Sequence, residues 1–409
     1  MKVCLLTYRG NMYCGGQGIY VYYLAKALHE LGHEVHIMTG PPYADAPEGV
    51  KVHRIEGLNL YETYGLASLQ HPLRLFHPIN FYEVIATSLG MFPEINTFSI
   101  KAYLRLREIM AREKFDIIHD NQTLGYGLLL AKGLGVPVIA TIHHPIYIDM
   151  KADLAQARHF VNKLRRMMFY SFLVMQHFVA KHMDRVITVS DISATDTARV
   201  LKISRDRVRV VPNGIDTAVF NKAEGVEKDP NSVLMVGNTE DRKKGVVYLL
   251  KAIQLLRDEI DLRLVIVDRQ GDHTRYAPRL VHEHGLEDLV TFTGRLDTPD
   301  LVRRYSASEV AVTASVYEGF GLPCAEAMSC GTPVIATRAG ALPEVVGSDG
   351  AGVLVPPADP YALAAEIKRL LLDGGLRQRM GATARKRIEE CFSWHVAAKK
   401  TVEVYEEVL

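Results

Sequence analysis

The feature that most constrains the fold is an alternation, along nearly the whole chain, of short apolar runs and longer amphipathic stretches. Short apolar runs that alternate with helical patterns are typical of parallel sheets with helices on both faces. The alternation starts again after the turn Val211-Pro212-Asn213-Gly214, whose proline and glycine interrupt regular structure. The sequence therefore predicts an α/β protein with two doubly wound domains of similar size.

The predicted elements can be given as residue ranges. In the first domain we expect strands at 2–7, 34–38, 115–119, 136–142 and 185–189, and helices at 18–31 and 191–202. In the second we expect strands at 232–236, 262–267, 289–293, 309–313 and 333–336, and helices at 244–257, 273–285, 297–307, 359–373 and 376–390. Doubly wound sheets bind ligands at the carboxyl ends of their strands, so a site in a cleft between the domains is expected.

Composition argues against several classes of protein. The formal net charge is +1, whereas proteins that bind nucleic acid usually carry a basic excess. No segment offers about 20 uninterrupted apolar residues, and the first apolar run has the length of a strand rather than of a signal peptide. The five cysteines form no CxxC pair, which indicates buried free thiols. A cytoplasmic location is therefore expected.

Two segments depart from the alternation. Residues 58–100 are rich in aromatic residues, Pro and Asn, and are expected to be irregular; an acceptor-binding loop, a membrane-touching loop and a packed insertion all fit this pattern. Residues 151–183 are predicted to form one long basic helix with interleaved aromatic residues and methionines. We favour a helix that packs on the sheet and solvates its charges, with attachment to an anionic membrane surface as the alternative.

One apparent metal motif is discounted. His29-Glu30-Leu31-Gly32-His33 matches the HExxH pattern of zinc proteases, which requires both histidines on one helical face. Gly32 is expected to cap the helix that precedes strand 34–38, so that His33 leaves the helix. No metal site is therefore predicted.

The strongest chemical motif follows the predicted strand 309–313. It begins with Glu318-Gly319-Phe320-Gly321-Leu322 and opens a helix that carries Pro323 and Glu326 in its first turn. Amide groups of the Gly-Phe-Gly run are predicted to form a nest for an anion. Two carboxylates that flank such a nest can hold sugar and ribose hydroxyls while a phosphate occupies the amides. The alternative is a plain helix cap with an incidental acid.

Three further motifs also follow predicted strands. Gly15-Gly16, after the first strand, would let backbone amides approach a phosphate, although a tight turn gives the same pattern. Arg242-Lys243-Lys244-Gly245 offers cations to a leaving diphosphate, unless it is a solvated charge run. His143 ends the strand 136–142 and is predicted either to donate to a substrate hydroxyl or carbonyl, or to be a core histidine.

Together these motifs resemble the family-4 retaining glycosyltransferases of the GT-B fold, a group that includes phosphatidylinositol mannosyltransferases. The matching segments are Gly15-Gly16, Thr141-Ile142-His143, Val211 to Asp216, Lys244-Gly245, the Glu318 and Glu326 pair, and a closing helix from Phe392 to Leu409. The resemblance implies two Rossmann-like domains that face each other across a cleft. Residues 1–210 with 392–409 would form the acceptor-side domain, and residues 211–391 the donor-binding domain.

The resemblance also implies a role for each site residue. Glu326 would hold the donor ribose, and Glu318 would touch the transferred sugar or its phosphate. Lys244 would bind the diphosphate, and His143 would contact the sugar near the reacting carbon. Other donor-binding positions are Gly15, Gly16, Asn238, Arg242, Gly319, Phe320, Gly321 and Leu322. The family retains the anomeric configuration and needs neither a metal ion nor a cofactor, because the nucleotide sugar is a co-substrate.

Two positions depart from the pattern of the family. Asn238 follows Gly237 where the family usually has Arg, which removes one cation from the diphosphate site. Asp268 follows the strand 262–267 where Gly is usual. Arg242 or Lys243, on the same loop as Asn238, could replace the missing charge.

The predicted function is transfer of a hexosyl group from a UDP- or GDP-sugar to the hydroxyl of a lipid-linked or small-molecule acceptor, in envelope glycoconjugate synthesis. Two alternatives stay open. A nucleotide-sugar 2-epimerase would share the architecture, and a catalytically impaired nucleotide-sugar-binding protein would explain Asn238. Peripheral contact with the inner face of the membrane is also left open by the segments 58–100 and 151–183.

Overall fold

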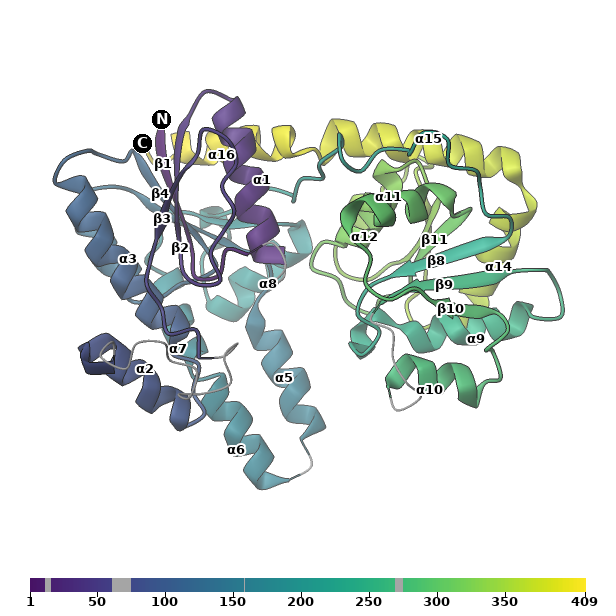
Figure 1. Ribbon diagram of the computed structural model, residues 1–409, viewed down its shortest axis with the longest axis horizontal. Helices are drawn as coiled ribbons and strands as arrows, with labels where there is room; N and C mark the ends of the chain where they lie inside the picture. Colours follow the sequence, from purple (N-terminus) through teal and green to yellow (C-terminus); the bar gives the residue numbers. More distant parts are fainter. Residues whose placement is uncertain (12–15, 61–74, 158, 269–274) are drawn as a thin grey trace. The chain divides into compact units, whose positions relative to one another are not determined.

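The computed structural model describes residues 1–11, 16–60, 75–157, 159–268 and 275–409 (Figure 1). The chain forms two compact units, Met1–Gly214 with Ala397–Leu409, and Ile215–Val396. The first division falls directly after the predicted Pro-Asn-Gly turn. Each unit is a parallel sheet with helices on both faces, so the fold is two Rossmann-like domains, as the alternation of elements predicts.

The first unit contains a parallel sheet in the order β3-β2-β1-β4-β5-β6-β7. Its strands are β1 Lys2–Thr7, β2 Glu34–Thr39, β3 Lys51–Arg54, β4 Ile117–Asn121, β5 Val138–Ile142, β6 Val186–Thr188 and β7 Val208–Val210. The central strands are buried on both faces, which explains their continuous apolar runs. The edge strands β3 and β7 were not predicted because they are short and partly exposed.

The helices of the first unit correct two predictions. They are α1 Gly16–Glu30, α2 Pro78–Ser88, α3 Glu94–Met110, α4 Gly127–Lys132, α5 Ile146–Gln156, α6 Phe160–Phe169, α7 Phe172–Ala180 and α8 Asp191–Leu201. The prediction that 58–100 is irregular is wrong for α2 and the start of α3, while residues 61–74 lie outside the described residues.

The prediction of one long helix over 151–183 is wrong, because α5, α6 and α7 are separate. The backbone leaves the helical region at Ala157 (ψ 110°) and again near Tyr170 (ψ 9°). At the second break Phe169 and Phe172 both pack on Phe92, with ring centroids 5.5 and 5.7 Å away. Tertiary packing therefore outweighs the continuous helical pattern, which contains no Gly or Pro to mark the breaks.

The second unit contains a sheet in the order β10-β9-β8-β11-β12-β13. Its strands are β8 Ser232–Val236, β9 Arg263–Val267, β10 Val290–Phe292, β11 Val310–Thr313, β12 Val334–Thr337 and β13 Val353–Val355. The helices are α9 Val246–Leu256, α10 Tyr276–Glu283, α11 Thr298–Ala307, α12 Leu322–Ser329, α13 Leu342–Val346, α14 Pro360–Leu372 and α15 Gly374–Cys391. The helix α16, Trp394–Glu406, starts in this unit, and its residues from Ala397 onward belong to the first unit.

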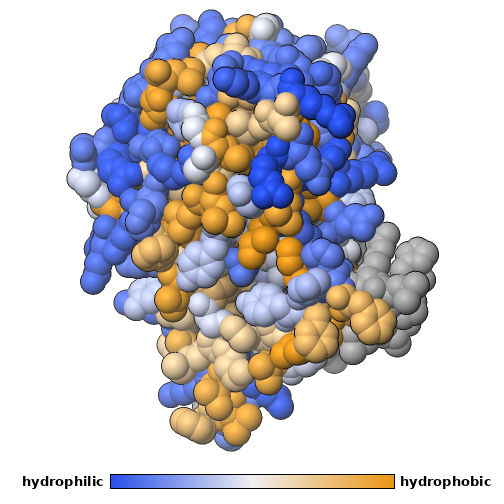
Figure 2. Space-filling view, turned by 90° about the vertical axis from the view of Figure 1, so that its left-hand side faces the viewer, coloured by the Kyte–Doolittle hydropathy of each residue, from blue (hydrophilic) through white to orange (hydrophobic). Residues whose placement is uncertain are grey.

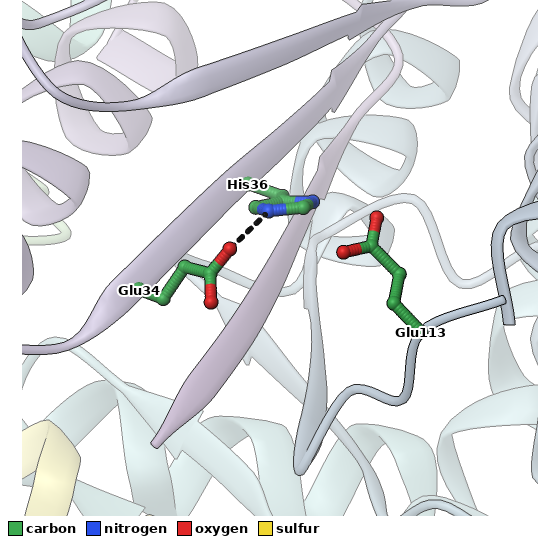
Figure 3. Close-up of side chains that lie close together, drawn as sticks. All are labelled: Glu34, His36 and Glu113. Carbon is green, nitrogen blue, oxygen red and sulfur yellow. Dashed lines mark hydrogen bonds and ion pairs between the residues drawn. The ribbon is translucent and has the colours of Figure 1, made fainter.

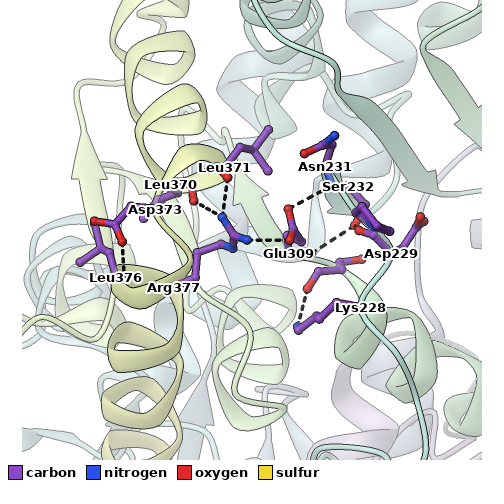
Figure 4. Close-up of polar contacts among 12 residues, drawn as sticks. Lys228, Asp229, Asn231, Ser232, Glu309, Leu370, Leu371, Asp373, Leu376 and Arg377 are labelled. Atoms are coloured by element: carbon purple, nitrogen blue, oxygen red, sulfur yellow. Dashed lines mark hydrogen bonds and ion pairs between the residues drawn. The ribbon is translucent and has the colours of Figure 1, made fainter.

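A polar network ties α14 and α15 to the amino-terminal edge of the second sheet (Figure 4). The Arg377 guanidinium donates to the carbonyl oxygens of Leu370 and Leu371, each at 2.6 Å, and pairs with Glu309 at 2.6 Å. The other oxygen of Glu309 accepts from the amide of Asn231 at 3.0 Å. Because this network lies at the edge where strands begin, it supports the sheet without occupying the edge where ligands bind.

The structure also bears on the HExxH segment, the cysteines and the absence of a predicted membrane span. α1 ends at Glu30 and Gly32 has φ 87°, so His33 lies outside the helix and the zinc-protease reading is excluded. Cys4, Cys324 and Cys330 are buried free thiols, but Cys391 is exposed, so the prediction of buried thiols is wrong there; Cys14 lies outside the described residues. Within the described ranges, no helix is both long and apolar enough to cross a membrane.

Candidate active site

The donor-side residues lie where the order of the second sheet reverses direction. β8 and β11 are neighbours, and the chain leaves β8 toward β9 on one side and β11 toward β12 on the other. The loop after β8 carries Lys244, and the loop after β11 carries Glu318. In doubly wound folds this switch point, at the carboxyl ends of the strands, is where nucleotides bind.

Lys244 and Glu318 meet at this switch point. The Lys244 ammonium is 2.5 Å from Glu318 Oε1, and the Ser315 hydroxyl donates to the same oxygen at 2.9 Å. The Val316 amide donates to the carbonyl oxygen of Lys243 at 2.8 Å, which joins the two loops. Glu318 is buried and Lys244 is partly exposed. A cation is thus held at the switch point, on a side chain that is 25% exposed.

Glycine is required beside Lys244. Gly245 has φ 67°, and a Cβ at this position would lie 2.0 Å from the carbonyl oxygen of Ala314. The predicted helix 244–257 therefore starts later than expected: Arg242–Lys244 forms a 3-10 turn, and α9 begins at Val246. The glycine allows the loop after β8 to press against the end of β11, and this close approach brings Lys244 to Glu318.

The Gly-Phe-Gly run leads into α12, as predicted, and the side chain of Phe320 is buried in the protein. Gly321 is the N-cap of α12 with φ 99°, and Leu322 and Pro323 begin the helix. The first amides of a helix have no partner within it and favour an anion. The Phe320 side chain is buried and packs on Phe392, with ring centroids 5.8 Å apart. Phe320 can therefore serve a donor only through its backbone, while Gly319 precedes it in the same loop.

Glu326 projects from α12 toward α11. Its Oε2 atom accepts a hydrogen bond from the Tyr305 hydroxyl at 2.9 Å. Burial raises the pKa of Glu326 to about 7. An ionised carboxylate has lone pairs on both oxygens, so the same group can accept hydrogen bonds from the two hydroxyls of a ribose. Tyr305 was not predicted, because its contact with Glu326 joins two helices and leaves no local pattern.

The two departures from the family pattern lie close together. Asp268 accepts hydrogen bonds from the amide and the hydroxyl of Thr239, at 2.7 and 2.6 Å, and so fixes the start of the loop that ends at Lys244. Asn238 is exposed, and its Oδ1 accepts from the amide of Glu240 at 3.1 Å. The Arg242 guanidinium lies over the Tyr276 ring at 5.2 Å. Asp268 therefore has a structural role, and the Arg242 guanidinium packs on an aromatic ring.

In the first unit, His143 follows β5 and is held at two atoms. Its ring Nε2 lies 2.8 Å from Asn121 Oδ1, and its backbone amide donates to Gln122 Oε1 at 2.9 Å. Asn121 Nδ2 donates to the carbonyl oxygen of Gln17 at 3.1 Å, which orients the amide group. Because Asn121 Oδ1 can only accept, His143 Nε2 carries the proton.

The same geometry and the burial of the ring define the protonation state of His143. Burial, followed by the charge of His144, lowers the pKa of His143 to about 3, so the ring is neutral near pH 7. A neutral imidazole protonated at Nε2 has an unprotonated Nδ1. His143 therefore offers a hydrogen-bond acceptor at Nδ1, whereas the sequence had suggested a donor.

Sequence reasoning missed Asn121 and Gln122, although a signal was present. The predicted strand 115–119 lies at 117–121 in the structure, so Asn121 is its last residue. The run Asp120-Asn121-Gln122-Thr123 is polar yet buried. A polar run at the carboxyl end of a buried strand indicates a site in this fold.

Gly16 is the first residue of α1 and is exposed. A Cβ built on Gly16 meets no atom within 4 Å, so the fold itself does not require glycine there. Glycine leaves open space in front of the amino-terminal end of the helix, where an anion is favoured. Gly15, the other predicted residue of this loop, lies outside the described residues.

Among the described residues, one group of three potential metal ligands lies close together: Glu34, His36 and Glu113 (Figure 3). The Lys2 ammonium contacts both carboxylates, and the Lys51 ammonium is 2.8 Å from Glu34. Hydrogen bonds from Lys51 and Lys2 hold the pKa of Glu34 at about 2. Lysine charges thus neutralise the group, which lies at the amino-terminal edge of the sheet, opposite His143.

The fold and the paired loops define the class of protein as a GT-B glycosyltransferase. Comparisons agree: a family profile described as Glycosyltransferase Family 4 matches residues 14–219, and one described as Glycosyl transferases group 1 matches residues 216–387. The chain is 39% identical to an MMP alpha-(1->4)-mannosyltransferase from Mycolicibacterium hassiacum, covering 100% of this chain and 98% of the relative. It is 29% identical to a D-inositol 3-phosphate glycosyltransferase from Pseudarthrobacter chlorophenolicus, covering 97% and 91%.

A solved structure of sucrose-phosphate synthase from Thermosynechococcus elongatus is also similar, with a TM-score of 0.72 and 25% identity, covering 99% of this chain and 98% of that chain. The protein belongs to the family-4 glycosyltransferases and transfers a glycosyl group from a nucleotide-sugar donor to an acceptor. The comparisons do not support the 2-epimerase alternative.

Proposed function

We propose that this enzyme is a retaining hexosyltransferase that needs neither a metal ion nor a cofactor, with a mannosyl group as the first candidate for transfer. The 39% identity to a protein named as an α-mannosyltransferase supports the sugar. The observation that carries the chemistry is the 2.5 Å contact of Lys244 with Glu318 at the switch point beside α12. A UDP- or GDP-sugar is the expected donor.

The charges that develop during transfer match this site. When the bond between the anomeric carbon and the diphosphate oxygen breaks, negative charge grows on the diphosphate. Lys244 and the first amides of α12 stabilise that charge without needing a divalent ion. A cation and oriented amides thereby supply what a metal supplies in other transferases, which supports the proposal of metal independence.

The partners of the two carboxylates bear on how retention would be achieved. Glu318 is bound by Lys244 and Ser315, and Glu326 by Tyr305, so we assign both to binding rather than to attack on the sugar. The acceptor oxygen then forms its bond to the anomeric carbon on the face that the diphosphate leaves. The acceptor proton passes to the departing phosphate oxygen, and the configuration is kept. His143 Nδ1 accepts a hydrogen bond from a hydroxyl of the transferred sugar.

The acceptor is proposed to be a hydroxyl of a carbohydrate or of a lipid-linked carbohydrate, in envelope glycoconjugate synthesis on the cytoplasmic side of the membrane. We include peripheral membrane contact through α6. None of its described residues is buried, and Phe160 and Met167 are 79% and 58% exposed beside Lys163 and Arg165. Such a helix binds an anionic surface through apolar area and charge together.

Membrane contact is tested by flotation with neutral and anionic liposomes. Enrichment with anionic liposomes that is lost in Lys163→Glu with Arg165→Glu is the expected result. Equal recovery with and without liposomes would contradict membrane contact without affecting the assignment of the sugar transfer.

The function is tested by calorimetry and nucleotide release with a panel of UDP-, GDP- and ADP-sugars in the presence of a chelator. Binding of one nucleotide diphosphate sugar, with slow release of nucleotide when no acceptor is present, is the expected result. Binding without release, even when acceptors are supplied, would favour the catalytically impaired alternative that Asn238 raises. A requirement for a divalent ion would contradict metal independence.

A further inference from the structure

The first unit contains a cavity beside the residues that position His143. This cavity, of about 510 Å³, lies among α5, α6, α7 and the end of α8. Ile142 and His144, the two neighbours of His143 in the chain, line it. Gln122 also lines it, and its side chain bonds the His143 amide on one side and the His144 carbonyl oxygen, at 2.8 Å, on the other. The cavity therefore starts next to the His143 backbone.

The wall of the cavity is mainly apolar. Met150, Leu154 and Leu173 project from the helices around it. The polar groups in the wall are largely bound to protein already: Tyr170 donates to Asp153 at 2.7 Å, and His144 pairs with Asp149 at 2.6 Å. The volume lies within the range of ligand pockets, roughly 300–1,000 Å³. A ligand that fills this space has to be apolar, because few polar atoms are left to bind it.

The apolar lining of the cavity extends to the protein surface. Met167 and Val174 line the cavity and are still 58% and 75% exposed. Apolar side chains also gather on the lower part of the face shown in Figure 2. Lys202 lies in the cavity wall, and Lys163 and Arg165 lie on α6. An apolar cavity with exposed apolar lining and one lysine in its wall is complementary to an amphiphile that has an alkyl chain and a polar head.

We propose that this cavity is an acceptor subsite that takes the alkyl chain of an amphiphilic acceptor. The inference rests on the proposed function and narrows it, because it assigns the acceptor to alkyl-bearing hydroxyl compounds. An alkyl chain in the cavity would anchor the acceptor to the first unit. Burial of each methylene contributes a roughly fourfold gain in affinity.

Direct binding tests the subsite without relying on turnover. Alkyl mannosides from hexyl to dodecyl, each below its micelle concentration, would be titrated into the full chain by calorimetry. We expect one site per chain and an affinity that rises with each methylene. The variant Met150→Trp fills the cavity and is expected to remove this dependence, with at least tenfold weaker binding of the longest compound. Ala155→Trp, on the exposed side of the same helix, is the matched control and is expected to behave as wild type.

Several outcomes would overturn the subsite. Affinity that does not depend on chain length would do so, as would equal loss in Met150→Trp and Ala155→Trp. Binding seen only when the mannoside is embedded in vesicles, and unaffected by Met150→Trp, would assign the effect to the surface of α6 instead. Leu154→Phe is a smaller filling variant for the case that Met150→Trp unfolds. Donor titration of the same samples separates failure of the subsite from failure of the proposed function, because the Lys244 and Glu318 pair, which carries the proposed function, belongs to the other unit.

Discussion

The amide oxygen of Asn121 lies 2.8 Å from Nε2 of His143, and through this contact a residue of β4 determines which ring nitrogen of His143 carries the proton. The orientation of Asn121 is itself set by the carbonyl oxygen of Gln17 in the first turn of α1. The first turn of α1, the end of β4 and the end of β5 are thus linked by two hydrogen bonds. His143 is positioned to accept a hydrogen bond at Nδ1.

Replacing Asn121 tests this positioning role. Asn121→Ala removes the partner of Nε2 and lets the ring adopt the other tautomer, so kcat is expected to fall about tenfold, the value of one oriented hydrogen bond. Because Asn121 acts through His143, the double variant with His143→Ala should be no slower than His143→Ala alone. Steady-state kinetics of the two single variants and the double variant test this role. If the fold-losses of kcat in the single variants multiply in the double variant, Asn121 acts independently of His143.

Donor binding is predicted to depend on pH through Glu326. Burial raises the pKa of this carboxyl to about 7, and ribose hydroxyls donate to the ionised form. Proton binding therefore competes with donor binding: affinity is full above pH 7 and falls up to about tenfold for each pH unit below it. Calorimetry between pH 5.5 and 8 measures this dependence. In Glu326→Gln, binding should be weaker at pH 8 and independent of pH, and an unchanged profile would exclude Glu326 as the ribose ligand.

Glycine at position 16 is predicted to be needed for activity but not for the stability of the fold. Open space surrounds its missing Cβ, so Gly16→Ala should keep or slightly raise the melting temperature, since Ala is the better helix former. Activity should nevertheless fall at least tenfold, because the added methyl group lies at the helix end that we propose as an anion-binding position. Gly18→Ala is the contrast: its Cβ would lie 2.3 Å from the Asn11 carbonyl oxygen, so stability itself should drop. Full activity of Gly16→Ala would remove this loop from the site.

Breaking the ion pair between Arg377 and Glu309 is expected to lower the stability of the fold without changing the donor site. Both side chains are largely buried, with 18% and 12% of their surfaces exposed. Arg377→Met leaves the Glu309 charge unpaired and should lower the free energy of unfolding by about 3–5 kcal/mol. Adding Glu309→Leu should recover part of this loss. Urea unfolding measures both, and donor affinity of the folded variants should equal that of wild type. No recovery in the double variant would contradict the electrostatic explanation.

Much of the fold could be predicted from local sequence patterns, as the loops after β8 and β11 illustrate. Lys244-Gly245 and the Glu318 to Glu326 segment could be predicted because each lies in the connection that follows a buried strand, where this topology places ligand groups. Glycine, proline and acid at short spacing constrain the backbone locally, so the structure confirms the helix start at α12.

The remaining features depend on contacts between residues far apart in the chain. Tyr305 binds Glu326 from another helix, and Asn121 binds His143 from another strand, and neither contact leaves a local pattern. The breaks that divide residues 151–183 occur where Phe169 and Phe172 pack on Phe92. The cavity among α5, α6 and α7 exists only because of those breaks, so a single long helix could not have indicated it.

The most direct test of the whole account is titration of UDP and GDP into wild type, Lys244→Met and Lys243→Met, with a chelator present. Lys243 belongs to the same 3-10 turn but pairs with Asp241, so it controls for a general loss of charge. We expect that one nucleotide binds wild type and Lys243→Met with similar affinity and binds Lys244→Met at least tenfold more weakly. Transfer should fall about 10²–10³-fold in Lys244→Met. Equal binding and transfer by Lys244→Met and wild type would contradict the assignment of the switch point as the diphosphate site.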